Sequence, residues 1–434
     1  MLNRGTFSRR RPPVTVLLVW GGQALQSAPS GLGHLASILE RNGYRAEMVN
    51  LDAGDEDRLC ALCEDLNVDI LGFSGLTCQM TTAYTLARRV KQDRPQCLAI
   101  VGGVHPSGLP LRTLRECEAL DAVVVGEGEQ TVLALAEAAE THDRVDKIPG
   151  LALPDRCGGV TTRQREYIDN LDDLPFAKQE MYGRAPGNET TIDAVRGCIY
   201  RCLNCPIPQL FGRRFRLRSP GSLAEEIEML ASSDVRTVRL PHCIPFRSHK
   251  GWARELYRQL SARGLNREVM LQVDGMPPML DDESIDLLVE MGFRRIDFWG
   301  ACSGDDRILR TMRKPFTAQQ LENTLRQCKG RGLEVFLSFA FGNVGESEAS
   351  ATASIELAKR VQADQYWFGV VRPFPCTGAW SVGPKVNEEA EGCWDEYDSQ
   401  PQRPIGPLLP NELPFERVFA LAEQARKETE RTGA

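Results

Sequence analysis

Three cysteines close together in the chain have the spacing of an iron-sulfur ligand set. Cys198, Cys202 and Cys205 stand in the segment RGCIYRCLNCPIP, which gives C-x3-C-x2-C spacing. Three thiolates on one loop can bind three irons of a [4Fe-4S] cluster and leave the fourth iron without a protein ligand. We therefore expect a cluster with one open iron, at which a cofactor or substrate can coordinate. Tyr200, inside the loop, is expected to shield the cluster.

Zinc binding and chance clustering are the alternatives for these cysteines. A closed zinc site needs a fourth ligand, and no Cys or His follows at zinc-finger spacing. The chain has 14 cysteines in 434 residues, which in a long cytosolic protein indicates reduced thiols with metal ligands among them. Cys60 and Cys63 form a further C-x2-C pair, but they fall in a helical pattern with no second pair, which favours packing.

The elements that must position the cysteine loop lie in the second half of the chain. Short β-branched runs alternate there with amphipathic helical stretches, as in parallel βαβ units. Six such units suit a partial (β/α)6 barrel, with its site at the carboxyl ends of the strands. The cysteine loop follows the first strand, and His242, Cys302 and Arg372, at the ends of three others, are candidate catalytic residues. The expected strands are 190–196, 235–240, 268–273, 294–300, 334–342 and 364–371.

The first half of the chain shows the same alternation and predicts a doubly wound parallel sheet. Its expected strands are 14–20, 45–50, 68–74, 97–103 and 121–127. Glycines and small polar residues gather after four of these strands, where glycine lets a large planar cofactor approach the backbone. A tight turn explains any one of these groups alone, and His105 could equally cap a helix. The residues expected to bind the cofactor are Ser30, Gly31, Ser74, Thr77, Gly102, Gly103, His105, Glu127 and Gly128.

Charge and composition limit the partners of the protein. The net charge of -7 argues against a broad basic surface for nucleic acid. The apolar run after the basic N-terminus is too short for a signal sequence, and no stretch reaches the roughly 18 apolar residues of a membrane span. We expect a cytoplasmic protein with a small-molecule substrate and no membrane or nucleic-acid partner. The expected parts are a basic tail (1–13), a first α/β domain (14–140), a connector with a small hairpin (141–188), the partial barrel (189–385) and a tail with a short helix (386–434).

The motifs together resemble those of the radical S-adenosylmethionine (SAM) enzymes, a superfamily with C-x3-C-x2-C after the first strand of a (β/α)6 barrel. The preceding Rossmann-like domain is similar to a cobalamin-binding domain, so the chain resembles the cobalamin-dependent radical SAM subgroup over about residues 14–385. The resemblance implies three cofactors: a [4Fe-4S] cluster, SAM and cobalamin. The segments that carry it, besides the cysteine loop, are PSGLGHLASILERNGY, VGGVHPSG, VVGEGEQT, GNVGESEASATASIELAKR and RPFPCTGAW.

Three positions that face SAM in the superfamily carry different residues in this chain. The residue before the third cysteine is usually aromatic and is Asn204 here. The second barrel strand usually ends in an acidic or glycine-rich stretch, and here it reaches His242. The fourth usually ends in Gly-x-Glu-Ser, and here Cys302 replaces the glutamate that binds the ribose. The resemblance therefore implies that Asn204 and Cys302 face the cofactor.

The resemblance implies a methyltransferase that uses methylcobalamin to methylate a carbon of a small-molecule or natural-product precursor. SAM bound in the superfamily manner is cleaved to a 5'-deoxyadenosyl radical by one electron, which a low-potential donor such as flavodoxin or ferredoxin would supply. Three alternatives remain open. They are a non-methylating rearrangement or cyclisation, polar methyl transfer from SAM without the radical, and a non-catalytic iron-sulfur binding or electron-transfer protein.

Overall fold

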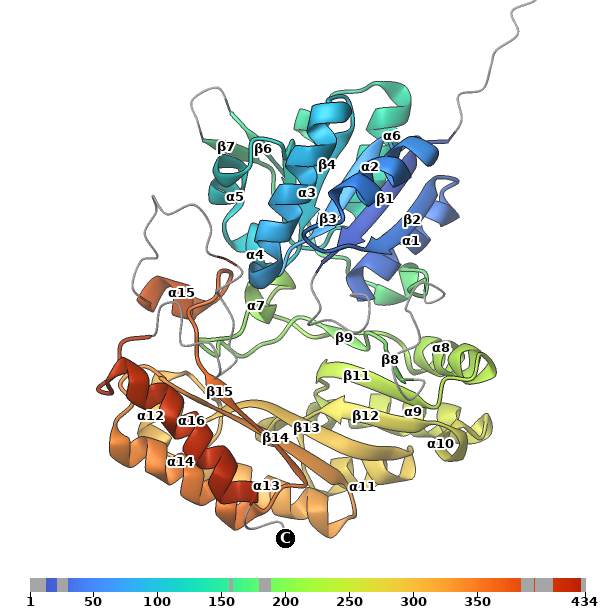
Figure 1. The fold of residues 1–434 in the computed structure, drawn as a ribbon. Coiled ribbons are helices and arrows are strands. Elements are labelled where there is room, and N and C mark those ends of the chain that lie inside the picture. The colour runs from blue at the N-terminus through green and yellow to red at the C-terminus, as the bar shows by residue number, and fades with distance from the viewer. Residues whose placement is uncertain are drawn as a thin grey trace, which may run out of the picture.

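The computed structural model describes residues 13–21, 30–155, 159–178, 189–383, 394 and 409–430. These residues form one large sheet in each half of the chain, and Figure 1 shows the blue and cyan N-terminal half above the yellow and orange second half. The predicted α/β class is confirmed. Within the described residues, no helix is long and apolar enough to cross a membrane. The predicted basic tail falls almost wholly outside the described ranges.

The first sheet has the strand order β2-β1-β3-β4-β5-β6-β7, and its first five strands pair in parallel. All five strands predicted for this half are present. The strands are β1 (Thr15–Trp20), β2 (Arg45–Asn50), β3 (Ile70–Ser74), β4 (Leu98–Gly102), β5 (Ala122–Val124), β6 (Leu151–Pro154) and β7 (Val160–Thr162).

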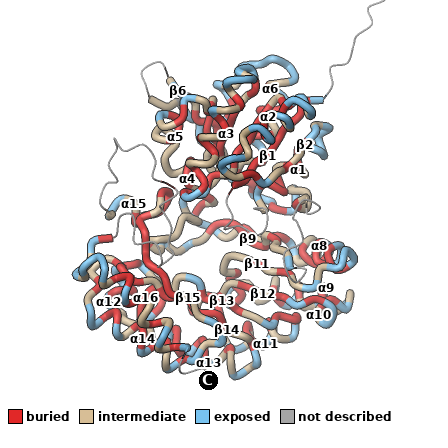
Figure 2. Tube along the Cα trace, in the orientation of Figure 1, coloured by how far each residue is buried: buried red, intermediate tan, exposed pale blue. Residues whose placement is uncertain are grey.

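Both faces of this sheet are buried, as a doubly wound fold requires. Along β1, Leu17 and Val19 pack into one apolar cluster, while Val16 and Leu18 pack into another on the opposite face. Figure 2 shows the buried strands as red tube between helices with exposed outer sides. The helices are α1 (Ser30–Arg41), α2 (Glu56–Asp65), α3 (Met80–Asp93), α4 (Val104–Gly108), α5 (Pro110–Glu116) and α6 (Glu129–Thr141), with 3-10 turns η1 (Thr77–Gln79), η2 (Val145–Lys147) and η3 (Leu171–Asp173).

The hairpin predicted within residues 141–188 is confirmed, and it extends the first sheet. Ala152 pairs with Thr162 in antiparallel register, and Leu151 pairs with Val124 of β5. The sequence predicted this hairpin within a connector and did not indicate that it would pair with the first sheet. The difference arises because backbone pairing at a sheet edge is available to any strand that reaches it and leaves no mark in the side-chain pattern.

The second sheet has the order β15-β14-β13-β12-β11-β8, with all neighbours parallel. The two end strands β15 and β8 are not neighbours, so the barrel is open, as predicted. The first predicted strand is divided into two short strands, and the second of these pairs with β10. The strands are β8 (Glu189–Thr191), β9 (Val195–Arg196), β10 (Arg216–Leu217), β11 (Thr237–Cys243), β12 (Met270–Asp274), β13 (Phe293–Cys302), β14 (Glu334–Phe341) and β15 (Gln365–Val370).

The predicted short C-terminal helix is present as α16 (Phe415–Glu430), which lies along the strands β14 and β15 (Figure 1). Its buried residues include Val418, Leu421 and Ala425. The other helices of this half are α7 (Ile207–Leu210), α8 (Pro220–Ser232), α9 (Lys250–Ala262), α10 (Leu265–Glu268), α11 (Asp282–Glu290), α12 (Asp306–Thr311), α13 (Ala318–Gly330), α14 (Glu348–Val361) and α15 (Gly378–Val382), with 3-10 turns η4 (Phe246–Ser248) and η5 (Pro277–Met279).

Candidate functional site

The cysteine loop begins where β9 ends. Gly197 follows β9 with a φ of +80°, and a Cβ atom there would lie 2.1 Å from the Arg214 carbonyl oxygen. Only glycine tolerates both the left-handed backbone and this close approach. The Cys198 amide then donates to the Gly212 carbonyl at 3.1 Å, so the loop is closed at its base next to the first thiol.

Leu203 fixes the middle of the loop. Its amide donates to the Met312 carbonyl at 2.9 Å, and its carbonyl accepts from the Ala379 amide at 2.8 Å. Its buried side chain packs with Ile308, Met312 and Ala379. The loop is thereby tied to the turn after α12 and to α15, which limits the positions that its thiols can take.

The three thiols fit a [4Fe-4S] cluster. Cys198, Cys202 and Cys205 are free, partly exposed and close enough to interact electrostatically. Burial raises the pKa of Cys198 to about 11, so its deprotonation would depend on the metal. Among the described residues, no three His, Cys, Asp or Glu side chains converge on a position for one metal ion. This arrangement is compatible with a cubane, because each thiolate binds its own iron.

A cavity of about 360 Å³ lies between the carboxyl edge of the first sheet and the mouth of the partial barrel. Thr77 and His105, which the sequence also assigned to the cofactor, do not line it. Residues from the second half that the sequence did not assign to this site include Asp193, Arg196 and Phe211. The predicted site residues that line the cavity are Ser30, Gly31, Ser74, Gly102, Gly103, Glu127, Gly128 and His242.

The cavity wall fits a large planar cofactor such as cobalamin. Gly31 has no atom within 4 Å of the place where its Cβ would stand, so a side chain there would fill the cavity. Gly103 has a φ of +110°, and a Cβ atom there would lie 3.0 Å from the Gly75 carbonyl oxygen. Leu35 and Leu210 are among the apolar side chains of the wall. Apolar walls with a few placed polar groups are usual for cofactor sites.

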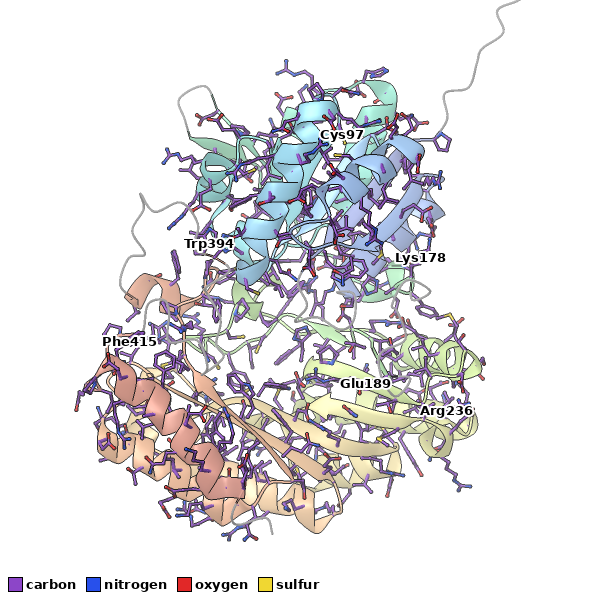
Figure 3. The ribbon with its side chains drawn as sticks, in the orientation of Figure 1. Cys97, Lys178, Glu189, Arg236, Trp394 and Phe415 are labelled. Carbon is purple, nitrogen blue, oxygen red and sulfur yellow. The ribbon has the colours of Figure 1, made fainter. Side chains whose placement is uncertain are left out.

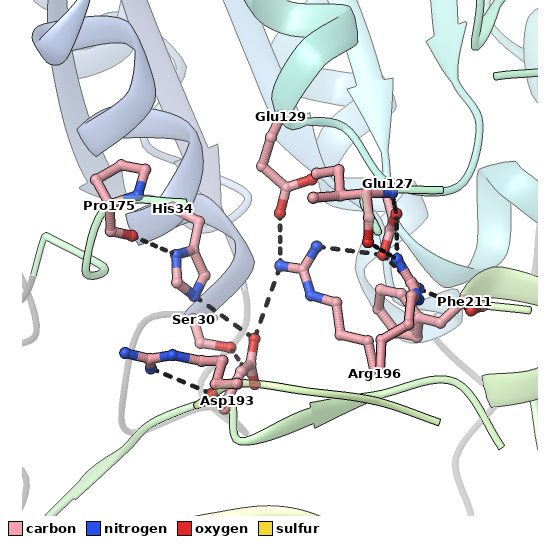
Figure 4. Close-up of polar contacts among 11 residues, drawn as sticks. Ser30, His34, Glu127, Glu129, Pro175, Asp193, Arg196 and Phe211 are labelled. Atoms are coloured by element: carbon pink, nitrogen blue, oxygen red, sulfur yellow. Dashed lines mark hydrogen bonds and ion pairs between the residues drawn. The ribbon is translucent and has the colours of Figure 1, made fainter. Parts of the chain in front are cut away.

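A buried network of charges joins the two halves at one side of the cavity (Figure 4). Arg196 contacts Glu127 at 3.3 Å and Glu129 at 2.5 Å. Arg216 donates to both carboxylate oxygens of Glu127, at 2.8 and 3.0 Å, and the Ile168 amide donates to the same carboxylate at 2.9 Å. The Glu127 carboxylate, which the sequence assigned to the cofactor, is thus bound by protein groups.

Asp193 adds a carboxylate to the cavity wall. Its side chain lies 3.7 Å from the His34 Nε2 atom and 3.5 Å from the Ser30 hydroxyl. Burial acts to raise the pKa of Asp193, but the charges of His34 and Arg196 outweigh burial and lower the pKa. The one signal in the sequence was an acidic residue inside an otherwise apolar strand pattern, TTIDAVR.

His242, a catalytic candidate, comes from the end of β11 and lines the cavity. Its φ of +70° is left-handed, and its amide donates to the Asp274 carboxylate at 3.0 Å. Its ring lies 6.4 Å from the Phe211 ring, centre to centre. The strained backbone at His242 therefore holds the imidazole at the cavity wall next to an aromatic ring.

Cys302 and Asn204 meet on the inner side of the cysteine loop. Cys302 is buried, and its thiol lies 3.8 Å from the Asn204 Nδ2 atom. The nearby positive charge of Lys314 acts to lower the pKa of this thiol, against the stronger effect of burial, which raises it. The structure therefore brings together two of the three positions that differ from the superfamily pattern, and it adds a lysine that the sequence did not indicate.

Two other predicted residues lie apart from the cavity. The Tyr200 amide acts to lower the pKa of the Cys198 thiol, so Tyr200 affects the loop through its backbone. Arg372 is buried, with its guanidinium 5.5 Å from the centre of the Phe419 ring in α16. This candidate therefore packs against the C-terminal helix.

His105 is buried inside the first half. Its Nδ1 atom lies 3.3 Å from the Thr77 hydroxyl, and its ring meets the Trp394 ring edge-on at 4.5 Å. Figure 3 labels Trp394 beside the first half, while Phe415 lies on the second half. Thr77 and His105 thus form a packed group with a residue from beyond the barrel.

Comparisons with known proteins agree with this two-part architecture. The B12 binding domain profile matches residues 23–136, and the Radical SAM superfamily profile matches residues 192–358. These matches confirm the predicted cobalamin-binding and radical SAM domains.

Relatives and solved structures extend the similarity along most of the chain. An uncharacterized methyltransferase of Pyrococcus horikoshii is 26% identical over 380 residues, covering 85% of this chain and 81% of the relative. An anaerobic magnesium-protoporphyrin IX monomethyl ester cyclase of Rubrivivax gelatinosus is 24% identical, covering 82% and 67%. The radical SAM methyltransferase TsrM of Kitasatospora setae, solved with cobalamin and a [4Fe-4S] cluster, has a TM-score of 0.72 at 21% identity, covering 85% and 74%. The chain is an enzyme that combines a B12-binding domain with a radical SAM domain, homologous to the cobalamin-dependent radical SAM methyltransferases.

Proposed function

We propose that this enzyme transfers a methyl group to a carbon atom of a small-molecule or natural-product precursor. The supporting observation is the shared cavity. One wall comes from the glycine-rich edge of the B12-binding domain. The other comes from the barrel mouth and includes Arg196, which is two residues before Cys198 in the chain. A site formed by both halves brings cobalamin and the cluster to one substrate position. Two relatives carry names of this kind, a hopanoid C-3 methylase and a tryptophan 2-C-methyltransferase.

The residues of this chain have distinct roles in the proposal. Cys198, Cys202 and Cys205 would hold the cluster, and the glycines at the carboxyl edge of the first sheet would hold cobalamin, which supplies the methyl group when bound. Asp193 and His242 line the cavity and could position a polar substrate or exchange a proton with it. A substrate held between the two halves would be oriented toward both cofactors.

An anaerobic assay of the reconstituted protein tests the proposal. Iron, sulfide and cobalamin are quantified, and the protein is then incubated with SAM and a low-potential reductant. We expect cobalamin to be bound and S-adenosylhomocysteine to form as the bound cobalamin is methylated. Protein that binds iron but takes up no cobalamin would contradict the proposal.

Variants of the cysteine loop provide the matched control. Alanine at Cys198, Cys202 and Cys205 should abolish the brown absorbance of the cluster, because three irons lose their ligands. Alanine at Cys328, a buried thiol in α13, should leave the absorbance unchanged. Absorbance that persists in the triple variant would refute the ligand assignment.

Two specific observations support alternatives within the same class. Similarity to the magnesium-protoporphyrin cyclase favours a non-methylating cyclisation, which would give a product without the mass gain of a methyl group. The unusual Asn204, His242 and Cys302 favour polar methyl transfer, in which S-adenosylhomocysteine forms without 5'-deoxyadenosine. Measurement of 5'-deoxyadenosine during turnover separates the radical from the polar reaction. If the absorption spectrum of the cluster does not change when SAM is added, the result would instead support a non-catalytic iron-sulfur protein.

The proposal also covers the electron donor, the location and the domain limits of the enzyme. We propose a flavodoxin-like or ferredoxin-like electron donor and a cytoplasmic location, because a reduced cluster needs a low-potential donor and a reducing compartment. We also propose the domain limits expected from the sequence, 14–140 and 189–385, with a connector, 141–188, whose hairpin adds two strands to the edge of the first sheet.

A further inference from the structure

A lysine stands on a turn that is hydrogen-bonded to the cysteine loop. Lys314 follows α12, and its amide donates to the Leu309 carbonyl at 2.8 Å. Arg313, just before it, has a left-handed backbone with a φ of +55°. Two residues before Lys314, the Met312 carbonyl accepts from the Leu203 amide of the cysteine loop at 2.9 Å. The backbone therefore fixes the position of Lys314 relative to the loop.

The ammonium group of Lys314 faces the sulfur atoms. Its charge interacts with the thiols of Cys302, Cys202 and Cys205. A Cβ atom on Gly300 would lie 3.4 Å from the Lys314 Nζ atom, at van der Waals contact, so the ammonium group lies beside the backbone of β13 two residues before Cys302.

The surroundings of Lys314 suit an anionic partner. Other cations close to the cavity, such as Arg196, pair with carboxylates, whereas no carboxylate among the described residues forms an ion pair with Lys314. A cluster held by three thiolates carries a net negative charge, and this charge grows when the cluster is reduced. A fixed cation at this place stabilises the reduced form more than the oxidised form.

We propose that Lys314 is the counter-charge of the iron-sulfur cluster and raises the reduction potential of that cluster. The inference rests on the cluster of the proposed function, but it does not depend on methyl transfer. Net charge and hydrogen bonds near the sulfurs are general determinants of cluster potentials. The higher reduction potential would make transfer of an electron from the donor to the cluster more favourable.

A redox titration of the reconstituted protein, followed by electron paramagnetic resonance, tests this inference. It is carried out without SAM, cobalamin or substrate on the wild type, Lys314→Met and Lys314→Arg. At the midpoint potential of the wild type, we expect Lys314→Met to have a tenfold lower ratio of reduced to oxidised cluster. This ratio corresponds to a shift of about 59 mV to more negative potential for one electron. Lys314→Arg keeps the charge and should stay close to the wild type.

Lys329→Met is the matched control, because it removes the same charge at the end of α13, where Lys329 pairs with Asp364 at 3.3 Å. Its cluster potential should be unchanged. If Lys314→Met takes up too little iron, Lys314→Gln is titrated in its place. Loss of the cluster in both neutral variants but not in Lys314→Arg also supports a role of the charge.

Two results would overturn the inference. One is a neutral variant with the potential of the wild type, and the other is loss of the cluster in all three Lys314 variants, including Lys314→Arg. A wild-type protein that binds no cluster would contradict the proposed function itself. The failure of the proposed function and the failure of the Lys314 assignment therefore give different observations.

Discussion

At the scale of single residues, the buried carboxylates beside the cavity depend on cations from the other half of the chain. Glu127 and Glu129 contact Arg196 and Arg216 with little access to solvent. A buried charge without its partner is strongly unfavourable, because the low-dielectric surroundings do not replace the lost interaction. The network therefore contributes to the association of the two halves as well as to the cavity wall.

We expect Arg196→Met to lower the free energy of unfolding by about 3 to 5 kcal/mol, because it leaves Glu129 buried without a cation. Urea denaturation followed by circular dichroism measures this change. Arg144→Met is the control, since Arg144 and Asp146 form an exposed pair at 2.8 Å. Exposed pairs contribute at most about 1 kcal/mol. Equal effects of the two substitutions would refute the role assigned to the network.

A second residue-scale prediction concerns pH. Burial, together with the charge of Arg112, lowers the pKa of His105 to about 3. The unfolded chain, with an ordinary histidine pKa of about 6.5, then binds more protons than the folded protein at intermediate pH. Stability from His105 is therefore complete above about pH 6.5 and is lost as the pH falls toward 3.

His105→Gln should remove this part of the acid sensitivity. Between pH 7 and pH 4.5 the wild type should lose about 2 to 3 kcal/mol more free energy of unfolding than the variant. Urea denaturation at a series of pH values measures the difference. Gln319→Asn, an exposed change in α13 that alters no ionisable group, is the control and should keep the slope of the wild type. Parallel curves for the wild type and His105→Gln would contradict the assignment.

At the scale of elements, the sequence predicted most strands because β-branched runs and helical periodicity agree with their tertiary positions. The cysteine loop was also predictable, since its ligands are neighbours in the chain. The sequence did not indicate that Asp193 and Arg196 line the cavity, because closure of the two halves brings them there. Nor did it indicate that Arg216 would bind Glu127, 89 residues away. Such contacts depend on tertiary packing and not on local pattern.

Gly197 offers an element-scale prediction about how the cysteine loop leaves β9. Gly197→Ala should displace the loop, because the new Cβ atom would meet the Arg214 carbonyl oxygen and the backbone would be left-handed. Iron content after reconstitution should fall severalfold. Gly221→Ala is the control, since no atom lies within 4 Å of its Cβ position in α8. It should bind normal iron, because the added methyl group meets no other atom. Normal iron in Gly197→Ala would contradict the geometry.

At the scale of the whole molecule, Trp394 connects a part of the chain beyond the barrel to the first half. Its side chain is buried, its Nε1 atom donates to Glu116 at 2.7 Å, and its ring lies 4.6 Å from the Arg112 guanidinium. The sequence treated residues 386–434 as a tail with a short helix. The sequence did not predict the contact of Trp394 with the first half. A single tryptophan in a polar stretch forms no helical or strand pattern from which its partner could be identified.

We expect Trp394→Ala to lower the free energy of unfolding by about 3 to 5 kcal/mol, the usual loss for a buried tryptophan. The first half should also become more sensitive to limited proteolysis, because α5 loses its cover. Trp299→Ala is the control, since Trp299 is 48% exposed and should lose less stability than Trp394→Ala. Unchanged stability and proteolysis in Trp394→Ala would refute the contact.

The Arg196 side chain also has a consequence for the distance between the two cofactors. Its guanidinium is bound to the glycine-rich edge of the first half, and its backbone is separated from Cys198 by a single residue. One side chain and two peptide bonds therefore act as a spacer between the cobalamin wall and the cluster loop. The connector adds a second tie at the same place, because the Ile168 amide donates to the Glu127 carboxylate and the Ile168 carbonyl accepts from Arg216. A shift of one half against the other would therefore break these contacts before it could change the spacing.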